Sequence, residues 1–180
     1  MVLALVPKAA LVSAALSFLA GCASVEEGRR RVSAETERGG FVRVATDSGP
    51  RPVLALLRSR AATETLTVYL EGDGAAWPSH WQPPRDPTPV RALVLDMAAL
   101  DNSSQVAYLA RPCQYLEAVA LAACPVELWT HRRFSEPAIA VLDAALSALK
   151  RASGASRLRL VGYSGGGVMA LALAARRADV

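Results

Sequence analysis

The chain has 180 residues, of which 52% are hydrophobic and 20% charged, so its composition fits one globular domain and excludes a disordered protein. The formal net charge is +4, and the basic residues are almost all arginines scattered along the chain. This distribution indicates a solvated surface and not a nucleic-acid-binding patch, so no nucleic-acid partner is expected.

The first twenty residues are apolar apart from Lys8 and a few small polar residues, which is typical of a signal peptide or a membrane anchor. The run Leu19-Ala20-Gly21-Cys22 that follows resembles the lipobox of bacterial lipoproteins. The resemblance implies that residues 1–21 are a signal peptide and that Cys22 carries the lipid. The protein is then expected to be exported and anchored on a membrane, facing the periplasm or the cell exterior. The alternative is an ordinary membrane anchor with a chance cysteine.

The segment after the lipobox, residues 22–40, is polar and rich in Glu and Arg, which predicts a tether, and the folded domain is expected over residues 41–180. The prolines of residues 75–89 predict a loop. Residues 90–100 fit a helix or a strand by pattern alone, and their length, with Pro89 suited to a first turn, favours a helix. From apolar patterns and turn signals, strands are expected at residues 41–44, 52–57, 66–70, 105–110 and 158–161.

Two further helices are expected in the second half of the chain. Ser135 is a suitable N-cap with Pro137 in the first turn, and apolar residues follow at helical spacing as far as Gly154. The last helix is expected over residues 168–177, after a glycine-rich turn at 162–167. Strands that alternate with helices favour a parallel α/β sheet, whereas early strands without intervening helices favour an antiparallel edge.

Gly162-Tyr163-Ser164-Gly165-Gly166 fits the pattern G-x-S-x-G, which is short but here follows a predicted strand and opens a predicted helix. That context places a serine on a strained turn, where its hydroxyl projects above the edge of the sheet. Ser164 is therefore the candidate nucleophile, and the backbone N–H of Gly165 is a candidate oxyanion donor. A second donor is expected from Asp73 and Gly74, in the loop after the third predicted strand, for which an ordinary tight turn is the alternative.

Three stretches, Val68–Gly74, Arg111–Tyr115 and Val161–Gly167, together resemble a group of bacterial secreted α/β-hydrolase-like proteins. The resemblance extends from Phe41 to the end of the chain. It implies an α/β-hydrolase-like sheet, with an antiparallel N-terminal edge and then parallel strands with flanking helices. It also implies a small-molecule ester or amide as substrate, an acyl-enzyme on Ser164, and no cofactor.

In this fold an acidic residue and then a histidine follow the nucleophile along the chain. Only 16 residues follow Ser164, and they include one acidic residue, Asp179, and no histidine. His80 and His131 both precede the serine, and neither is expected to be the base. The chain is thus expected to hold roughly the first two-thirds of the fold, with the C-terminal strands missing and the hydrolase inactive or incomplete. The alternatives are a non-catalytic envelope lipoprotein that uses the scaffold for binding, and a chance motif in a small α/β lipoprotein.

The chain has three cysteines, of which one is expected to be lipidated and the other two are expected to pair. When Cys22 is lipidated, Cys113 and Cys124 remain, and in an oxidising compartment they are expected to form a disulfide. These two cysteines lack a clear His or Cys partner pair, so no metal site is expected.

Two residues that flank the candidate site have expected supporting roles. Glu71, directly before the Gly72–Gly74 loop, is expected to order that loop by accepting backbone N–H bonds. Tyr163, beside the candidate nucleophile, is expected to line the pocket or to pack beneath it.

Overall fold

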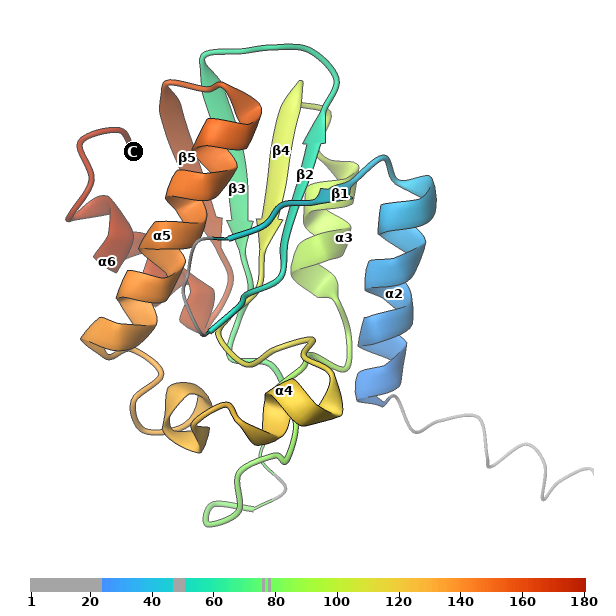
Figure 1. The fold of residues 1–180 in the computed structure, drawn as a ribbon, viewed down its shortest axis with the longest axis vertical. Coiled ribbons are helices and arrows are strands. Elements are labelled where there is room, and N and C mark those ends of the chain that lie inside the picture. The colour runs from blue at the N-terminus through green and yellow to red at the C-terminus, as the bar shows by residue number, and fades with distance from the viewer. Residues whose placement is uncertain (1–23, 47–50, 76, 78) are drawn as a thin grey trace, which may run out of the picture.

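The computed structural model describes residues 24–46, 51–75, 77 and 79–180. The expected signal peptide and the expected lipidation site Cys22 lie outside these residues. A five-stranded sheet forms the centre of the domain, with helices on both of its faces (Figure 1). Within the described part of the chain, none of the helices has the length and hydropathy needed to cross a membrane.

The strands, in chain order, are β1 (Val42–Arg43), β2 (Ala55–Ser59), β3 (Thr65–Leu70), β4 (Gln105–Leu109) and β5 (Arg157–Gly162). Their order across the sheet is β1-β2-β4-β3-β5. β2 runs antiparallel to β1 and to β4, whereas β3 lies parallel to β4 and to β5. This arrangement confirms the predicted sheet, with an antiparallel N-terminal edge followed by parallel strands. It brings the C-terminal ends of β3 and β5 to the same edge, where their loops meet.

The helices are α2 (Val25–Arg38), α3 (Leu93–Leu100), α4 (Ala118–Ala122), the 3₁₀-helix η1 (Val126–Trp129), α5 (Glu136–Ser153) and α6 (Gly165–Ala174). The apolar face of α5 packs with Met169 of α6 on one side of the sheet. On the other side, α3 packs with Val32 of α2 and with Tyr108 of β4. Successive residues of a strand point to opposite faces, so Leu70 of β3 joins the first cluster and Tyr69 the second.

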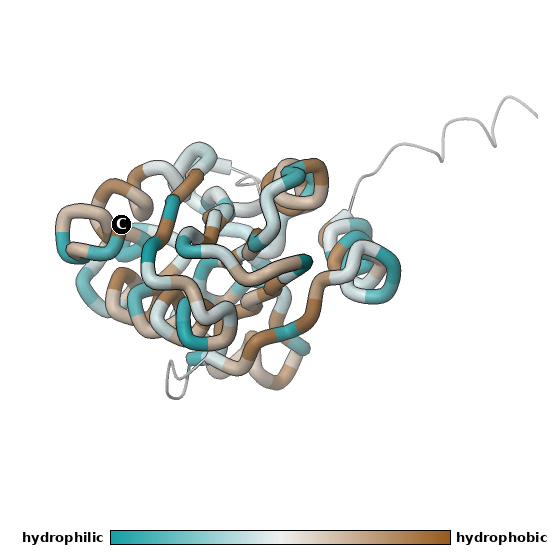
Figure 2. Tube along the Cα trace, turned by 90° about the horizontal axis from the view of Figure 1, so that it is seen from above, coloured by the Kyte–Doolittle hydropathy of each residue, from teal (hydrophilic) through white to brown (hydrophobic). Residues whose placement is uncertain are grey.

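Residues 25–38 form helix α2, which corrects the prediction of a tether for this segment. Most of the helix is hydrophilic, as its teal and white colours at the right of Figure 2 show, and this polarity is what favours a tether in the sequence. Val32 is nevertheless fully buried in the cluster that it shares with α3. Val25, Val32 and Ala34 are the apolar residues of this otherwise polar segment, too few to give a clear helical periodicity, so the sequence pattern does not reveal the docking of α2.

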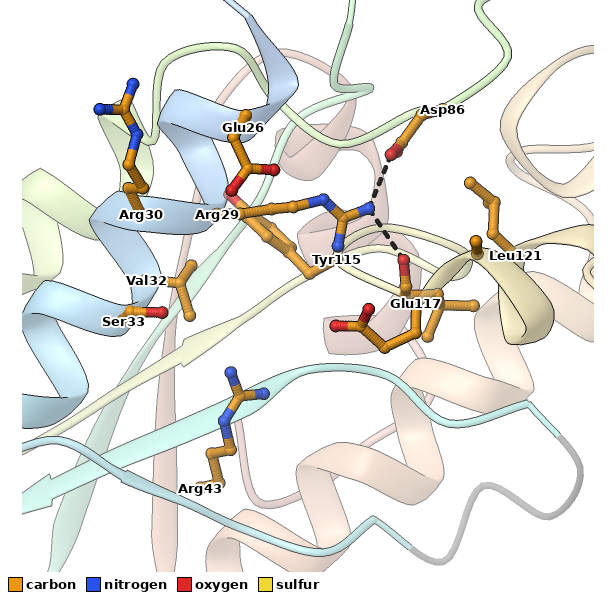
Figure 3. A pocket seen from close by; sticks show the side chains of 12 residues that line it. Glu26, Arg29, Arg30, Val32, Ser33, Arg43, Asp86, Tyr115, Glu117 and Leu121 are labelled. Carbon is orange, nitrogen blue, oxygen red and sulfur yellow. Dashed lines mark hydrogen bonds and ion pairs between the residues drawn. The ribbon is translucent and has the colours of Figure 1, made fainter.

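Two arginines of α2 also fix the helix to distant parts of the chain. The Arg31 guanidinium pairs with Asp96 of α3 at 2.6 Å. Arg29 pairs with Asp86 at 2.7 Å and donates a second hydrogen bond to the carbonyl of Leu116 at 2.8 Å (Figure 3). The folded unit of the described residues therefore begins at α2, before the predicted boundary at residue 41.

Strand β2 extends through Arg58 and Ser59, into a segment whose polarity predicts a turn. Arg58 is buried, and its guanidinium donates hydrogen bonds to the carbonyls of Ala98, Ala99 and Asp101 at the C-terminal end of α3. A cation at this position satisfies carbonyl groups that the helix leaves unpaired. The charged residue therefore belongs inside the fold, which its sequence context does not indicate.

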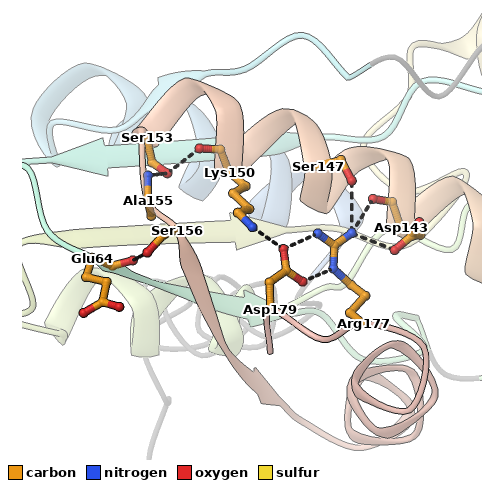
Figure 4. A network of polar contacts seen from close by, with 9 residues as sticks. All are labelled: Glu64, Asp143, Ser147, Lys150, Ser153, Ala155, Ser156, Arg177 and Asp179. Atoms are coloured by element: carbon orange, nitrogen blue, oxygen red, sulfur yellow. Dashed lines mark hydrogen bonds and ion pairs between the residues drawn. The ribbon is translucent and has the colours of Figure 1, made fainter.

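The C-terminal residues are held by a polar network on α5 (Figure 4). The Asp179 carboxylate accepts hydrogen bonds from Arg177, at 2.8 and 2.9 Å, and from Lys150 at 2.5 Å. Arg177 also donates to Asp143 at 2.7 Å and to the Ser147 hydroxyl at 3.0 Å. The hydrogen bonds from Arg177 and then from Lys150 hold the pKa of the Asp179 carboxyl well below its usual range.

We expect Asp179→Asn to lower the free energy of unfolding by about 1 to 2 kcal/mol at neutral pH, because it removes charge-assisted hydrogen bonds. The pKa of Asp179 is lower in the folded chain than in the unfolded chain, so this stability is present above about pH 4 and is lost as the pH falls through the folded-state pKa. Urea unfolding of both chains at neutral pH and at about pH 3 measures the difference, which should shrink at the lower pH.

The matched control for this prediction is Glu136→Gln, which removes an exposed ion pair with Arg176. It should change the free energy of unfolding by less than about 0.5 kcal/mol. A loss of stability in Asp179→Asn that is equally large at both pH values would contradict the role assigned to its charge.

Candidate active site

Ser164 occupies the turn between β5 and α6, in the strand–turn–helix context that the G-x-S-x-G pattern predicts. Its backbone has φ 52° and ψ −126°, a conformation with positive φ that a residue with a side chain rarely adopts. The residue is exposed, and among the described residues no group hydrogen-bonds to its hydroxyl. The turn therefore presents a serine hydroxyl at the C-terminal edge of the parallel strands.

Glycines of the motif let the strand, the turn and the helix approach one another closely. A Cβ at Gly162 would lie 2.5 Å from the carbonyl carbon of Gly166. A Cβ at Gly166 would lie 2.6 Å from the carbonyl oxygen of Glu71 and would overlap that of Leu70, at the end of β3. α6 begins at Gly165, three residues before the predicted start. Glycine has a low helix propensity, but here the close approach of the helix to β3 and β5 leaves no room for side chains.

The loop that follows β3, residues 72–74 and here called the glycine loop, lies against the serine turn. A Cβ built on its first glycine would be 3.6 Å from the Cβ of Ser164. Among the described residues, no group accepts a hydrogen bond from the backbone N–H of Asp73, Gly74 or Gly165. The structure thus brings Asp73 against Gly165 and the glycine loop against Ser164, and Gly74 lines a cavity together with Tyr163. Unpaired N–H groups beside an exposed serine hydroxyl are the groups that an oxyanion needs as donors.

The glycine loop is held from below by buried polar side chains. Glu71 is buried, and its carboxylate accepts hydrogen bonds from the Gly72 N–H and the Tyr108 hydroxyl, both at 2.8 Å. Burial raises the pKa of Glu71, and these two hydrogen bonds oppose the rise. The Tyr115 hydroxyl lies 3.2 Å from that of Tyr108, and Gln114 donates to the Gly72 carbonyl at 3.1 Å. The expected ordering role of Glu71 is confirmed by its bond to the loop amide.

Two arginines, which no sequence motif marks as site residues, hold the Asp73 carboxylate. Arg111 Nη1 lies 3.2 Å from Asp73 Oδ1, and Arg133 Nε lies 3.2 Å from Asp73 Oδ2. Arg111 is buried, and its Nη2 donates to the carbonyl of Arg133 at 2.6 Å. Burial lowers the pKa of the Arg111 guanidinium, and Asp73 opposes that change. These three residues are called the arginine–aspartate cluster below.

A cross-linked turn between β4 and α4, residues 111–115, supplies two of the side chains that hold the glycine loop. Cys113 in this turn forms a disulfide with Cys124, with a Cα–Cα distance of 5.9 Å, as predicted. Cys113 and Tyr115 both have positive φ, of 72° and 59°, which marks a tightly wound backbone. The turn thereby directs Arg111 to Asp73 and Gln114 to the carbonyl of Gly72.

Neither histidine hydrogen-bonds to Ser164. His80 is exposed in the loop that precedes α3. His131 follows η1, and its Nδ1 lies 3.4 Å from the hydroxyl of Thr130. Across the described ranges, no three His, Cys, Asp or Glu side chains gather in a group that could hold a metal ion.

A cavity of about 640 Å³ adjoins the glycine loop and the serine turn. Tyr163 and Gly74 line it on the side of the site, which places Tyr163 in the expected pocket-lining position. Its remaining lining residues come from α2, from the segment before α3 and from α3 itself: Glu27, Arg31, Ala75, Pro89, Val90, Arg91, Ala92, Leu93 and Asp96. A second cavity, of about 460 Å³, lies between α2 and α4 (Figure 3). Half of its lining residues are charged, and it includes neither Ser164 nor any residue of the glycine loop.

Comparison with known proteins gives two solved structures of low similarity. One is a hormone-sensitive lipase from a metagenome library, with 19% sequence identity and a TM-score of 0.42, over 85% of this chain and 45% of that one. The other is a dienelactone hydrolase-like promiscuous phosphotriesterase from metagenomic libraries, with 19% identity and a TM-score of 0.43, over 77% of this chain and 55% of that one. The chain thus spans about half the length of each structure. No family model and no curated protein matches it.

Proposed function

We propose that the protein is a serine hydrolase that cleaves a small-molecule carboxylic ester, or an amide, through an acyl-enzyme on Ser164. One observation carries the proposal. An exposed serine on a strained strand–helix turn lies beside three backbone N–H groups, of Asp73, Gly74 and Gly165, that have no acceptor among the described residues. N–H groups that no protein group occupies remain available to a bound oxyanion, so their presence beside a nucleophile supports oxyanion stabilisation.

In the proposed reaction the Ser164 oxygen attacks the substrate carbonyl carbon, and its proton passes to a base. The carbonyl oxygen becomes negative and accepts hydrogen bonds from the N–H groups of Asp73, Gly74 and Gly165, assisted by the N-terminus of α6. The bond to the leaving oxygen or nitrogen then breaks, and that atom takes up a proton. Water attacks the acyl-enzyme in the same way and releases the acid. This chemistry needs no cofactor.

None of the hydrogen bonds among the described residues supplies a base for Ser164. Neither His80 nor His131 hydrogen-bonds to Ser164, and serine requires a neighbouring base to act as a nucleophile. We propose that a histidine, oriented by an acidic residue, is supplied from sequence that follows residue 180 in a longer protein. The α/β-hydrolase order of nucleophile, acid and histidine supports this assignment.

The cavity beside the site is the proposed binding place for one arm of the substrate. Its lining combines apolar residues, among them Val90 and Leu93, with charged ones that include the ion pair between Arg31 and Asp96. Its volume of about 640 Å³ lies in the range of small-molecule sites. An apolar acyl or alcohol group of moderate size is therefore the proposed substrate feature.

We also propose that the enzyme lies outside the cytoplasm and is anchored to a membrane by a lipid attached to Cys22. The lipobox-like run at Leu19–Cys22 supports this, as does the disulfide between Cys113 and Cys124, because disulfides persist in oxidising compartments. Metabolic labelling with a fatty-acid analogue, in cells that express the chain or its Cys22→Ser variant, tests the anchor. Equal incorporation of label into both would refute it.

Labelling with a fluorophosphonate probe tests the nucleophile. We expect a chain extended downstream of residue 180 to be labelled, and the label to disappear in Ser164→Ala. Ser156→Ala, which alters an exposed serine directly before β5, is the matched control and should be labelled like the parent. Label that survives in Ser164→Ala, or an extended chain that is never labelled, would contradict the proposed function.

The second candidate function is a non-catalytic envelope lipoprotein that uses the same scaffold to bind small molecules. It is favoured by one observation, that no described side chain hydrogen-bonds to the Ser164 hydroxyl. An extended chain that binds esters without hydrolysing them, and that is not labelled by the probe, would support this function.

A further inference from the structure

We propose that Arg111 and Arg133 act as positioning residues that neutralise Asp73, so that its carboxylate can pack against the Ser164 turn without opposing negative charge there. The catalytic meaning of this inference rests on the proposed function, because an oxyanion is the negative charge in question. The effect of the Asp73 charge on a negative group at residue 164 does not depend on that function, and a thiol at this position measures it directly.

The Asp73 carboxylate lies against the turn that carries Ser164. A Cβ at Gly165 would overlap the Asp73 carboxylate, so that group lies directly on the first residue of α6. The N–H of Gly165 and the N–H of Asp73 itself are proposed oxyanion donors. A bare carboxylate at this distance would repel a second negative charge on the same donors and would compete for the positive N-terminus of the helix.

Two positively charged side chains, Arg111 and Arg133, surround the Asp73 carboxylate. Its two oxygens each accept a hydrogen bond from a different guanidinium, at 3.2 Å in both cases. Two cations thus face one carboxylate, and the Arg111–Arg133 carbonyl bond ties them into one unit. The other carboxylate near the loop, Glu71, is bonded to the Gly72 N–H and to Tyr108, and it remains unchanged in every variant compared below.

The burial of Arg111 indicates that this arrangement is more than a surface ion pair. Only 4% of its side chain is exposed, and its Nε has no hydrogen-bond partner among the described residues. Burying a guanidinium is unfavourable unless a nearby negative charge compensates it. Asp73 provides that compensation while its backbone stays in the glycine loop. The two arginines of the arginine–aspartate cluster therefore hold the glycine loop through the Asp73 side chain. Their positive charges also offset the negative charge of the Asp73 carboxylate beside the Ser164 turn.

A thiol placed at the nucleophile position reports the charge at the turn without needing a base or a substrate. In a Ser164→Cys chain, the rate of alkylation by iodoacetamide at neutral pH follows the thiolate fraction, and peptide mass spectrometry separates this thiol from the other cysteines. Adding Arg133→Gln should slow alkylation about threefold to tenfold, because it removes one of the two guanidinium charges that face Asp73, and the less compensated carboxylate disfavours the thiolate. Adding Asp73→Asn to that variant should restore the rate to within about twofold of the parent.

Two further variants make the test decisive. Asp73→Asn alone should raise the alkylation rate about threefold above that of the Ser164→Cys parent. Because this variant leaves the buried Arg111 without its counter-charge, the rate is compared only when its circular dichroism matches that of the parent. Arg132→Gln removes a neighbouring exposed cation that makes no hydrogen bond to Asp73 and should leave the rate unchanged. A slow rate in Arg133→Gln that Asp73→Asn does not restore would overturn the inference. So would an Asp73→Asn rate no higher than that of the parent. Because the thiol assay uses no hydrolysis, these outcomes remain distinct from a failure of fluorophosphonate labelling.

Discussion

Gly166→Ala is expected to lower the free energy of unfolding by about 3 kcal/mol or more, whereas Gly167→Ala, one residue further along α6, is expected to be neutral or slightly stabilising. A Cβ at residue 166 would lie 2.6 Å from the Glu71 carbonyl oxygen and closer still to that of Leu70. These are backbone atoms at the end of β3, which cannot turn aside as a flexible side chain can. At residue 167 the nearest atom, the carbonyl oxygen of Gly162, is 3.4 Å away.

Urea unfolding followed by tryptophan fluorescence measures both variants. Alanine has a higher helix propensity than glycine by up to about 1 kcal/mol, so the two substitutions have the same intrinsic helix effect and differ only in what the added methyl group meets. The Gly166 variant should also lose reactivity at Ser164, because separating α6 from β3 moves the serine turn away from the glycine loop. Equal stability of the two variants would show that the tight junction described at the serine turn is not present.

Glu71→Leu is expected to lower the free energy of unfolding by about 2 to 4 kcal/mol and to loosen the glycine loop. The substitution leaves the Gly72 N–H and the Tyr108 hydroxyl without their buried acceptor. Amide hydrogen exchange of the glycine loop should become faster in this variant than in the parent, because local opening no longer breaks a hydrogen bond to a buried carboxylate.

Glu71→Gln is the matched control for this second prediction. It has nearly the same shape and keeps a carbonyl oxygen for the Gly72 N–H, so its loss of stability should stay below about 1.5 kcal/mol. Its loop amides should exchange at nearly the rate of the parent. If the Gln and Leu variants lose equal stability, the hydrogen bond to Gly72 is not what orders the loop, and the charge of Glu71 is the cause instead.

The parts of the fold that sequence patterns predict are those with local signals. The apolar strands, the helix that begins after Ser135 and the glycine-rich turn at Ser164 all follow from spacing and turn residues, and together they give the mixed sheet. The insertion of β4 between β2 and β3 follows from none of these signals, because strand pairing depends on contacts between distant residues. Helix α2 is missed for a related reason, since a buried Val32 and two ion pairs hold an otherwise polar segment.

Some residues of the candidate site also have a local sequence signal, and others have none. The motif predicts Ser164 and Gly165, and the glycine loop after a strand predicts Asp73 and Gly74. Their proximity then follows from the parallel pairing of β3 with β5. The side chains that hold the loop, Arg111, Gln114 and Arg133, carry no such signal. They lie in turns between elements, and only the folded chain brings them to Asp73 and Gly72.

The pairing of β3 with β5 also determines when this site forms as the chain folds. The two strands that carry its halves begin 92 residues apart in the sequence, as the contact between Glu64 and Ser156 shows. Contacts of such large sequence separation carry a high entropic cost before they gain any stability, so they are formed late and slowly. β4 and α5 both lie within that interval and give the closing strand a surface on which to align. A chain halted part-way through folding would therefore possess every residue of the site and none of its geometry.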